Sequence, residues 1–250
     1  MRRFFIAFFL LGSVFTSFAQ YKMRTIDQLV NREDPAWTVL NKWIDSAKNK
    51  VEVLPVDTLK AKEALYKTQV TTRSIMGAIV YSTGGILIDN GWIRILGSGS
   101  AQMKRTLPGW NKGKAFKEFG DPPAFILVAD DAAGGYFAIN YGNFGRDIDS
   151  MYYLSPDNLK WEPLKINYED FVWFCLMGNL KKFYAGTRWS TWQKDVQNLK
   201  ADDVFHFNPP LWSREGKYID KSVRTPVPVG EEFFYEMDLR KEISPKKNGE

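Results

Sequence analysis

Residues 86–96, ILIDNGWIRIL, decide the fold class. Two apolar segments, ILID and WIRIL, stand on either side of Asn90-Gly91, the strongest short-range pattern for a tight β-hairpin turn. The stretch therefore predicts two antiparallel strands joined by this turn. The sequence on both sides of the hairpin predicts the rest of the sheet.

Further strands follow the hairpin along the chain. From Met76 onward the hydrophobic pattern is that of short strands, broken by glycine, aspartate or asparagine. One strand is expected before the hairpin, at residues 51–56. Four more are expected after it, at residues 124–130, 136–140, 151–155 and 161–165. Residues 101–123 are polar and carry several glycines and prolines, which predicts an exposed loop between strands.

Helices are expected on both sides of this run of strands. Thr25 and Gln28 have the spacing of a capping box, and Asp34-Pro35 is a second helix start. Residues 57–68 have a helical pattern as well. After the strands, Asn167 can cap a helix whose apolar residues share one face.

Helices, then strands, then helices predict an α+β domain. We expect a largely antiparallel sheet of about six strands, with helices from both ends of the chain packed on it, in a single domain at residues 20–235. From Asp202 onward prolines oppose helix formation and predict irregular structure: Pro209, Pro210, Pro226 and Pro228. Residues 236–250 are expected to form a polar tail.

Residues 1–19 have the layout of a secretory signal peptide. Arg2 and Arg3 precede an apolar run from Phe4 to Phe15, and small residues follow it up to Ala19. The run is shorter than the roughly 20 residues that a membrane-spanning helix needs. We therefore expect cleavage after Ala19, export to the periplasm or beyond it, and no membrane span in the mature chain.

Charge and cysteine content exclude several classes of partner and of stabilisation. The chain has 34 Lys and Arg against 29 Asp and Glu, and its net charge of +5 becomes +3 when Arg2 and Arg3 leave with the signal peptide, giving 32 against 29. No basic stripe with interleaved aromatic residues is present, so no nucleic-acid partner is expected. Cys175 is the single cysteine, which excludes an intrachain disulfide.

No pattern of catalytic or metal-binding residues stands out. His206 is the only histidine and lies among apolar residues, and Cys175 lies on the apolar face of a predicted helix. One histidine and one cysteine cannot supply the usual zinc ligand sets. We expect no metal and no cofactor, and a non-enzymatic function is favoured. Paired carboxylates from distant segments stay open as an alternative.

Residues 128–140, VADDAAGGYFAIN, contain the most distinctive polar cluster. Successive residues of a strand point to opposite faces, so Asp130 and Asp131 cannot easily share one metal ion. Gly134 and Gly135 supply the positive φ angles that a turn requires. The stretch therefore predicts a second hairpin, with Asp131 lining a groove at the end of the sheet.

Several long blocks resemble one bacterial family. They are RTIDQLVNREDPAW (24–37), VTTRSIMGAIVYSTGGILIDNGWIRILGSG (70–99), FILVADDAAGGYFAIN (125–140), FYAGTRWSTW (183–192) and PPLWSREG (209–216). In this order they resemble the family called domain of unknown function 2625, over roughly residues 23 to 230. The resemblance covers nearly the whole chain after the signal peptide.

A more distant resemblance concerns the strands and the helix after residue 129. ADDAAGGYFAIN, MYYLSPDNLKWEPL and NYEDFVWFCLMGNL look like the SUKH superfamily, many of whose bacterial members are immunity proteins that bind and neutralise a toxin. The resemblance implies an α+β fold, no enzymatic activity, and a binding surface near Asp131, Gly134, Gly135 and Tyr136. SUKH immunity proteins act in the cytoplasm, so the expected signal peptide departs from that pattern.

These observations favour an exported, non-enzymatic protein with a protein partner. We expect Arg73, Arg94 and Asp131 to act as charged anchors, and Trp92 and Trp110, which lie in or beside predicted loops, as large flat contacts. Trp110 in the polar loop is the best candidate for an exposed tryptophan. The alternative is a carbohydrate-binding or carbohydrate-active protein of the cell envelope, favoured by the aromatic content and by export.

Overall fold

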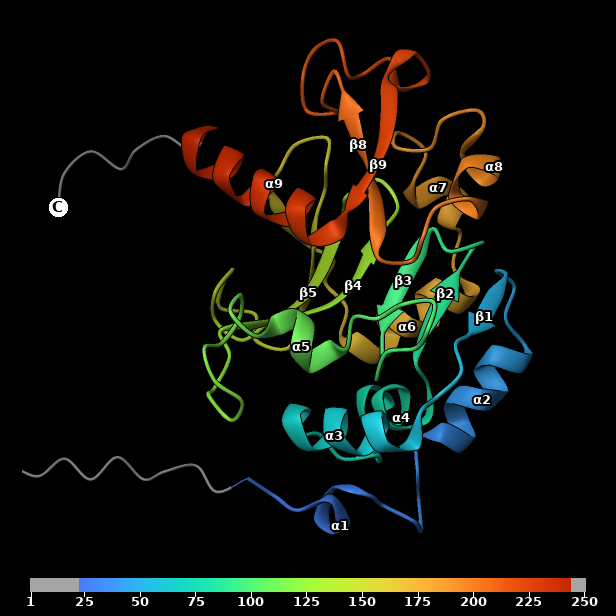
Figure 1. The fold of residues 1–250 in the computed structure, drawn as a ribbon, viewed down its shortest axis with the longest axis vertical. Helices are drawn as coiled ribbons and strands as arrows, with labels where there is room; N and C mark the ends of the chain where they lie inside the picture. Colours follow the sequence, from blue (N-terminus) through green and yellow to red (C-terminus); the bar gives the residue numbers. More distant parts are fainter. Residues whose placement is uncertain (1–22, 244–250) are drawn as a thin grey trace, which may run out of the picture.

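A seven-stranded antiparallel sheet runs through the middle of the molecule in a computed structural model of the chain, which describes residues 23–243 (Figure 1). Its strands lie side by side in chain order: β1 Val51–Val53, β2 Gly85–Ile88, β3 Ile93–Leu96, β4 Phe125–Asp131, β5 Tyr136–Asn140, β6 Met151–Leu154 and β7 Trp161–Pro163. The α+β class and the antiparallel sheet expected from the sequence are confirmed. The sheet has seven strands where about six were expected.

The Asn90-Gly91 hairpin forms as predicted. Strand β2 pairs with β3 from Ile88↔Ile93 to Gly85↔Leu96. Three successive residues before β3 have positive φ angles, 54° at Asp89, 63° at Asn90 and 86° at Gly91. Aspartate and asparagine tolerate this conformation better than other residues with a β-carbon, and glycine adopts it freely. These residues therefore determine where β2 ends and β3 begins.

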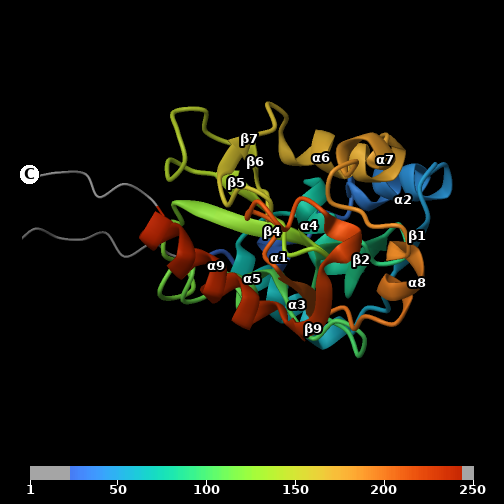
Figure 2. The same cartoon turned by 90° about the horizontal axis from the view of Figure 1, so that it is seen from above.

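Helices cover both faces of the sheet. They are α1 Ile26–Leu29, α2 Trp37–Asp45, α3 Thr58–Thr68, α4 Ile75–Ser82, α5 Leu107–Asn111, α6 Tyr168–Met177, α7 Leu180–Phe183, α8 Trp192–Gln197 and α9 Val229–Ile243. Seen from above, α6 and α7 lie on one side of the central strands, and α5 and α9 lie on the other (Figure 2). On β5, Phe137 packs on Phe171 of α6 with ring centroids 4.7 Å apart, and its neighbour Tyr136 packs on Phe233 of α9 at 5.0 Å.

Local capping residues begin α1, α3 and α6 at the predicted places, whereas the helix start expected at Asp34-Pro35 is wrong, because α2 begins at Trp37 with Ala36 as its N-cap and no side-chain cap. Thr25 and Gln28 form the capping box of α1. The Asp57 carboxylate accepts the main-chain N–H groups at the start of α3, and the Asn167 side chain accepts the N–H of Asp170 at the start of α6. Each cap satisfies N–H groups that have no partner inside the helix.

Residues 75–82 form helix α4, so the expectation of strand structure from Met76 onward is wrong up to residue 82. The Ser74 hydroxyl accepts the N–H of Gly77 and caps the helix. Residues Ile75 to Val80 are all buried, so the segment lacks the polar face by which an amphipathic helix is recognised. A β-carbon on Gly77 would lie 2.0 Å from the Thr71 carbonyl oxygen, so only glycine fits there.

Residues 101–123 were expected to form an exposed loop. They contain the short helix α5, and the residues of this helix are mostly buried, so the expectation is wrong for that part. The Thr106 hydroxyl accepts the N–H of Gly109, and Leu107, Trp110 and Asn111 are buried against the sheet. Met103 is buried as well, whereas most of the other residues between 101 and 123 are half-buried or exposed.

The chain after Asp202 contains two strands and a long helix, so the irregular structure expected there is confined largely to residues 209–218. Strands β8 (Asp203–Asn208) and β9 (Val223–Pro228) form a separate antiparallel pair, with a short 3₁₀ helix at Ile219–Lys221 before β9. The prolines of β9 are tolerated because, in the described part of the chain, β9 pairs on one side only. Helix α9 extends to Ile243 and so occupies the start of the expected tail at 236–250, where Glu236 is buried.

The expected signal peptide, residues 1–19, lies outside the described residues. Across residues 23–243, no helix combines the length and the apolar character that crossing a membrane would require.

The hairpin turn offers a direct test of the fold. Replacing Gly91 by alanine forces a β-carbon into the left-handed conformation and should lower the free energy of unfolding by about 1 kcal/mol. Denaturant unfolding followed by circular dichroism measures the change. Gly186→Ala is the control, since Gly186 has a negative or extended φ and open space around it, and should change stability by less than about 0.5 kcal/mol. Equal effects of both substitutions would contradict this account of the turn.

Candidate functional site

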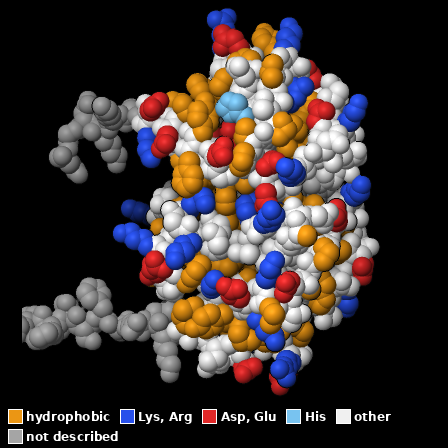
Figure 3. Space-filling view, in the orientation of Figure 1, with side chains coloured by type: hydrophobic (Ala, Val, Ile, Leu, Met, Phe, Trp, Pro, Cys, Tyr) orange, Lys and Arg blue, Asp and Glu red, His pale blue; other side chains and the backbone are white. Residues whose placement is uncertain are grey.

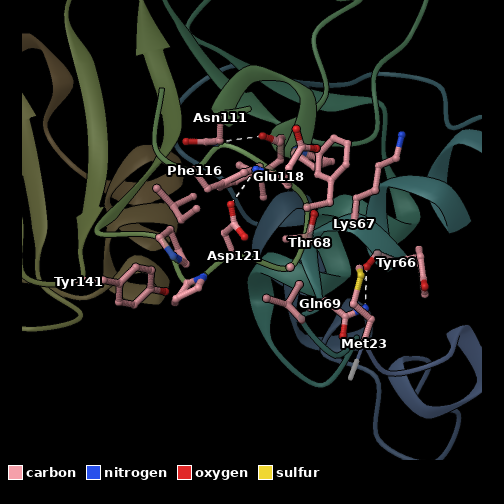
Figure 4. A pocket seen from close by; sticks show the side chains of 18 of the residues that line it. Met23, Tyr66, Lys67, Thr68, Gln69, Asn111, Phe116, Glu118, Asp121 and Tyr141 are labelled. Atoms are coloured by element: carbon pink, nitrogen blue, oxygen red, sulfur yellow. Dashed lines mark hydrogen bonds between the residues drawn. The ribbon is translucent and has the colours of Figure 1, made fainter. Parts of the chain in front are cut away.

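A large groove lies between helix α3 and helix α5, and we call it the α3–α5 groove (Figure 4). Its walls come from the C-terminal end of α3, from α5, from the loop 112–124 and from the start of β4. Its volume is about 1560 Å³. Typical pockets for small molecules have roughly 300–1,000 Å³, so this groove has room for a longer ligand.

Aromatic and other apolar side chains line much of the groove. The ammonium group of Lys67 lies 4.8 Å from the ring centroid of Phe119, which in turn lies 5.9 Å from the ring of Phe116. Tyr66 and Tyr141 lie at opposite sides of the groove and are 41% and 38% exposed (Figure 4). The other apolar lining residues are Met23, Val70, Met76, Leu107, Pro108, Pro122, Pro123 and Ile126.

Two side-chain amides in the groove pair with main-chain groups. Oδ1 of Asn111 accepts the N–H of Leu127 at 2.8 Å, and Nδ2 donates to the carbonyl of the same residue at 2.8 Å. In the same way, Oε1 of Gln69 accepts the N–H of Arg24 at 2.7 Å, and Nε2 donates to its carbonyl at 3.1 Å. Each amide therefore pairs with both main-chain groups of one residue, as a neighbouring strand would.

The acidic groups of the groove are engaged in local pairs. The Glu118 carboxylate pairs with Lys112 at 2.8 Å, and the Asp121 carboxylate accepts the N–H of Glu118 at 2.7 Å. The described residues that line the groove include no histidine, cysteine or serine. Burial, and secondarily the nearby Asp149, raise the pKa of Tyr141, so its hydroxyl stays protonated and can donate a hydrogen bond.

Arg94, expected as an anchor for a partner, is buried in an internal ion pair. It lies opposite Asp130 in the β3–β4 ladder, and its Nε donates to Oδ1 of Asp130 at 2.6 Å. Its Nη2 donates to the carbonyl of Asp131 at 3.1 Å. Both side chains are almost completely buried. The expectation of an accessible Arg94 is wrong, because the sheet uses the charge internally.

Arg105 and Asp202 extend this pair into a network. Arg105 pairs with the second oxygen of Asp130, and its Nε donates to Asp202 at 3.0 Å. Burial opposes the charge of Arg105, but its two carboxylate partners outweigh burial, so the pKa of Arg105 is raised. We define Arg94, Asp130, Arg105 and Asp202 as the charge network. It joins β3 and β4 to the segments before α5 and before β8.

Asp131, Gly134, Gly135 and Tyr136, expected to form a binding surface, lie together in the β4–β5 turn and are all buried. Oδ1 of Asp131 accepts the N–H groups of Ala133 and Gly135, and its Oδ2 accepts the Tyr153 hydroxyl. The stretch therefore builds a hairpin, as predicted. The expectation of an open groove beside Asp131 is wrong, because helix α9 packs over the turn.

Trp92 and Trp110, expected as exposed contacts, are both buried. Trp92 is 0% exposed and packs edge-on against Tyr184 and Trp192, at 5.3 and 5.2 Å between ring centroids. Trp110 is 7% exposed and packs on Phe233 of α9 at 5.9 Å. The expectation that both tryptophans are exposed is wrong, because helices from the C-terminal third of the chain cover both rings.

Arg73 is the one expected anchor that is exposed. Its side chain lies 4.0 Å from the carboxylate of Asp34, and both are more than half exposed. Arg73 does not line the α3–α5 groove. Among residues 23–243, no cluster of three or more histidine, cysteine, aspartate or glutamate side chains is arranged to hold a metal ion. Cys175 is buried, and burial raises the pKa of its thiol.

The residues that line the groove were not identified from the sequence. They come from segments between residues 23 and 141, and none of these segments carries a recognisable binding motif. Gln69 has a weak local pattern, since it ends α3 in the left-handed conformation with φ 60°. Asn111 has none, because its role depends on Leu127 of a strand that follows later in the chain.

Comparisons with known proteins place the chain in a family. A family model described as "Protein of unknown function DUF2625" matches residues 26–232. An "Uncharacterized protein" of Haemophilus influenzae is 46% identical over 189 residues, which are 76% of this chain and 83% of the relative. The "Putative uncharacterized protein YbfG" of Escherichia coli is 45% identical over 190 residues, 76% of this chain and 86% of the relative.

The charge network leads to a prediction about stability. Arg94→Met leaves the Asp130 carboxylate buried with one partner fewer, and should lower the free energy of unfolding by about 3–5 kcal/mol. Arg73→Met is the matched control, because the Arg73 side chain is 65% exposed, and it should change stability by less than about 1 kcal/mol. Urea unfolding of both variants measures the difference. A loss at Arg94 no larger than that at Arg73 would refute a structural role for the buried pair.

Proposed function

Since this chain belongs to the DUF2625 family, whose description assigns no activity, we propose a function from its groove. The protein is an exported, non-enzymatic binding protein that takes up a segment of a protein partner in the α3–α5 groove. The observation that carries the proposal is a groove of about 1560 Å³ that is walled by aromatic, proline and amide side chains.

The size and the lining of the groove support a polypeptide ligand. Partly exposed aromatic rings at opposite sides, Tyr66 and Tyr141, can hold apolar side chains of a ligand between them. Aromatic residues bury a large area and lose little side-chain entropy on binding, which is why they dominate the energetics of interfaces.

The amides of Gln69 and Asn111 stabilise the walls of the groove. Each one pairs with both main-chain groups of a residue of this chain, and Asn111 is fully buried. These amides therefore hold the segments around the groove together, and the contacts with a ligand fall to the partly exposed aromatic residues.

Export is supported by the N-terminal sequence. Arg2 and Arg3, the apolar run up to Phe15 and the small residues before Gln20 form the expected signal peptide. A partner outside the inner membrane fits this destination. A toxin acting there is one partner of the class that the SUKH resemblance implies.

A glycan is the second candidate ligand. The specific observation in its favour is the set of aromatic rings in the groove, since sugar rings pack on flat aromatic faces. Trp92 and Trp110 no longer support it, because both are buried.

The groove proposal predicts the effect of two substitutions on partner capture. Residues 20–250, immobilised and exposed to envelope extracts, should retain one protein in stoichiometric amount, identified by mass spectrometry. Tyr66→Ala and Tyr141→Ala should each weaken its retention about tenfold or more, the size of an interface hot spot. Tyr218→Ala is the matched control, because Tyr218 is 66% exposed and does not line the groove, and its binding should be unchanged.

Three outcomes of this capture are informative. Loss in all three variants, or in none, contradicts binding in the groove. Retention of oligosaccharides in place of a protein, lost in the Tyr66 and Tyr141 variants, replaces the protein partner by a glycan. If the immobilised protein retains neither a protein nor an oligosaccharide from the extract, the binding proposal is refuted.

Export predicts the N-terminus of the mature protein. Protein recovered from the periplasm or the medium should begin at Gln20, as measured by intact mass spectrometry. Replacing Ala19 by a bulky charged residue, as in Ala19→Arg, should block cleavage and leave the precursor in the membrane fraction. A chain that begins at Met1 and stays in the cytoplasm would contradict export, without bearing on the groove.

A further inference from the structure

Helix α9 closes one end of the sheet. It follows β9 directly and lies beside the β4–β5 turn (Figure 1). Phe233 packs edge-on against Tyr136 of β5 at 5.0 Å and against Trp110 of α5 at 5.9 Å. The Tyr136 hydroxyl donates to the carbonyl of Val229 at 3.4 Å. The helix therefore covers the turn that contains Asp131 and Gly134.

The carboxyl group of Glu236 lies in the middle of this contact and forms no salt bridge with any residue between 23 and 243. Glu236 is 4% exposed, and a β-carbon on Gly134 would lie 3.0 Å from its Oε1. Its Oε2 has no hydrogen-bond partner among the residues that the structure describes. Arg240, the cation one turn further along α9, donates from Nε to the carbonyl of Leu159 at 2.8 Å. A charged carboxylate buried in this way costs several kcal/mol, whereas a protonated one does not.

The groups around Glu236 add negative charge to its surroundings. Glu232, one turn earlier, contacts Nδ1 of His206 on β8 at 2.9 and 3.1 Å. His206 is at the surface beside acidic side chains (Figure 3). The charged and titratable groups that face Glu236 come from α9, the β4–β5 turn, β5 and β8: Glu232, Tyr235, Arg240, Asp131, Tyr136 and His206. Tyr153 of β6 lies behind Asp131 and donates its hydroxyl to that carboxylate.

We propose that α9 is a pH-sensitive latch, seated on the β4–β5 turn while Glu236 carries a proton and released when that proton is lost. Release uncovers Asp131, Gly134 and Tyr136. It also removes Phe233 from Trp110, whose neighbour Asn111 lines the α3–α5 groove. The latch is thus in contact with a wall of the groove, but its operation does not depend on what the groove binds.

The direction of the pH effect follows from proton linkage. Burial first, and then the charges of Glu232 and Asp131, raise the pKa of Glu236 well above its ordinary value of 4.5, with Arg240 opposing them. A seated helix with a raised carboxyl pKa binds the proton more tightly than a released one. Seating is therefore fully favoured below about pH 4.5 and weakens as the pH rises towards the pKa of the seated form.

Lys114, on the other side of α9, acts in the opposite direction. Its ammonium group lies over the rings of Trp110, Phe233 and Phe234, at 3.9, 5.7 and 5.3 Å from their centroids. Burial, and then the charge of Arg105, lower the pKa of Lys114 to about 8. Because the seated state prefers the neutral amine, this group favours seating as the pH rises above about 8. The contribution of Glu236 is therefore measured below pH 8.

Amide hydrogen exchange of the full chain tests the latch. Peptides from residues 229–243, corrected for the intrinsic effect of pH on exchange, should lose protection by about tenfold or more between about pH 5 and pH 7.5, one pKa unit being a factor of ten. Peptides from β5 should keep their protection over the same range. Equal loss in β5 would show global unfolding and would overturn the proposal.

Substitution of Glu236 completes the test. Glu236→Gln keeps the shape of the protonated side chain, so α9 should stay protected at both pH values. Glu242→Gln is the matched control, because Glu242 is exposed on the same helix, and it should behave as the unmodified chain does. Glu236→Met, neutral and similar in length, should also abolish the pH dependence and covers the case of a glutamine variant that does not fold. Persistence of the pH dependence in a folded variant at position 236 would overturn the proposal.

Discussion

Arg94 and Asp130 face each other across β3 and β4, shielded from solvent, and each charge compensates the burial of the other. Removing such charges from water costs several kcal/mol per ion, and the structure offsets that cost only by supplying further partners. Arg105 meets the second oxygen of Asp130, and Asp202 meets Arg105. Since Arg105 precedes α5 and Asp202 precedes β8, the positions of the segments that lead into these two elements depend on one buried carboxylate.

The same burial determines which surfaces are open to a ligand. Tyr136 and Phe137 send their rings to opposite faces of the sheet, and helices α9 and α6 cover them. Helix α9 therefore closes this end of the sheet. The α3–α5 groove remains open to solvent, and loop 112–124 forms one of its walls. The two proposals rest on different parts of this arrangement: binding rests on the partly exposed Tyr66 and Tyr141 in the groove, and the latch rests on Glu236.

The sequence predicts a structural element well where residues next to each other in the chain determine its conformation. Asn90-Gly91 predicted its turn because these residues tolerate positive φ angles, and Asn167 predicted the start of α6 because its side chain caps the helix. Helix α4 was missed because its residues are buried all round, which removes the periodic polar face. The tail expected at 236–250 was wrong for its first part because Glu236 is polar and nevertheless buried. The resemblance to the family called domain of unknown function 2625 was confirmed, whereas likeness to the SUKH superfamily stays a prediction.

The sequence by itself determined the α+β class, the antiparallel order of strands, the main turns and the family, because these follow from short-range conformational preferences and from blocks of residues. Only the tertiary structure decided which side chains are accessible. Trp92, Trp110, Arg94 and Asp131 are residue types that often mark binding sites, and all four are buried here by segments distant along the chain. Exposure depends on what packs against a residue from elsewhere in the sequence, and no local pattern around these residues contains that information.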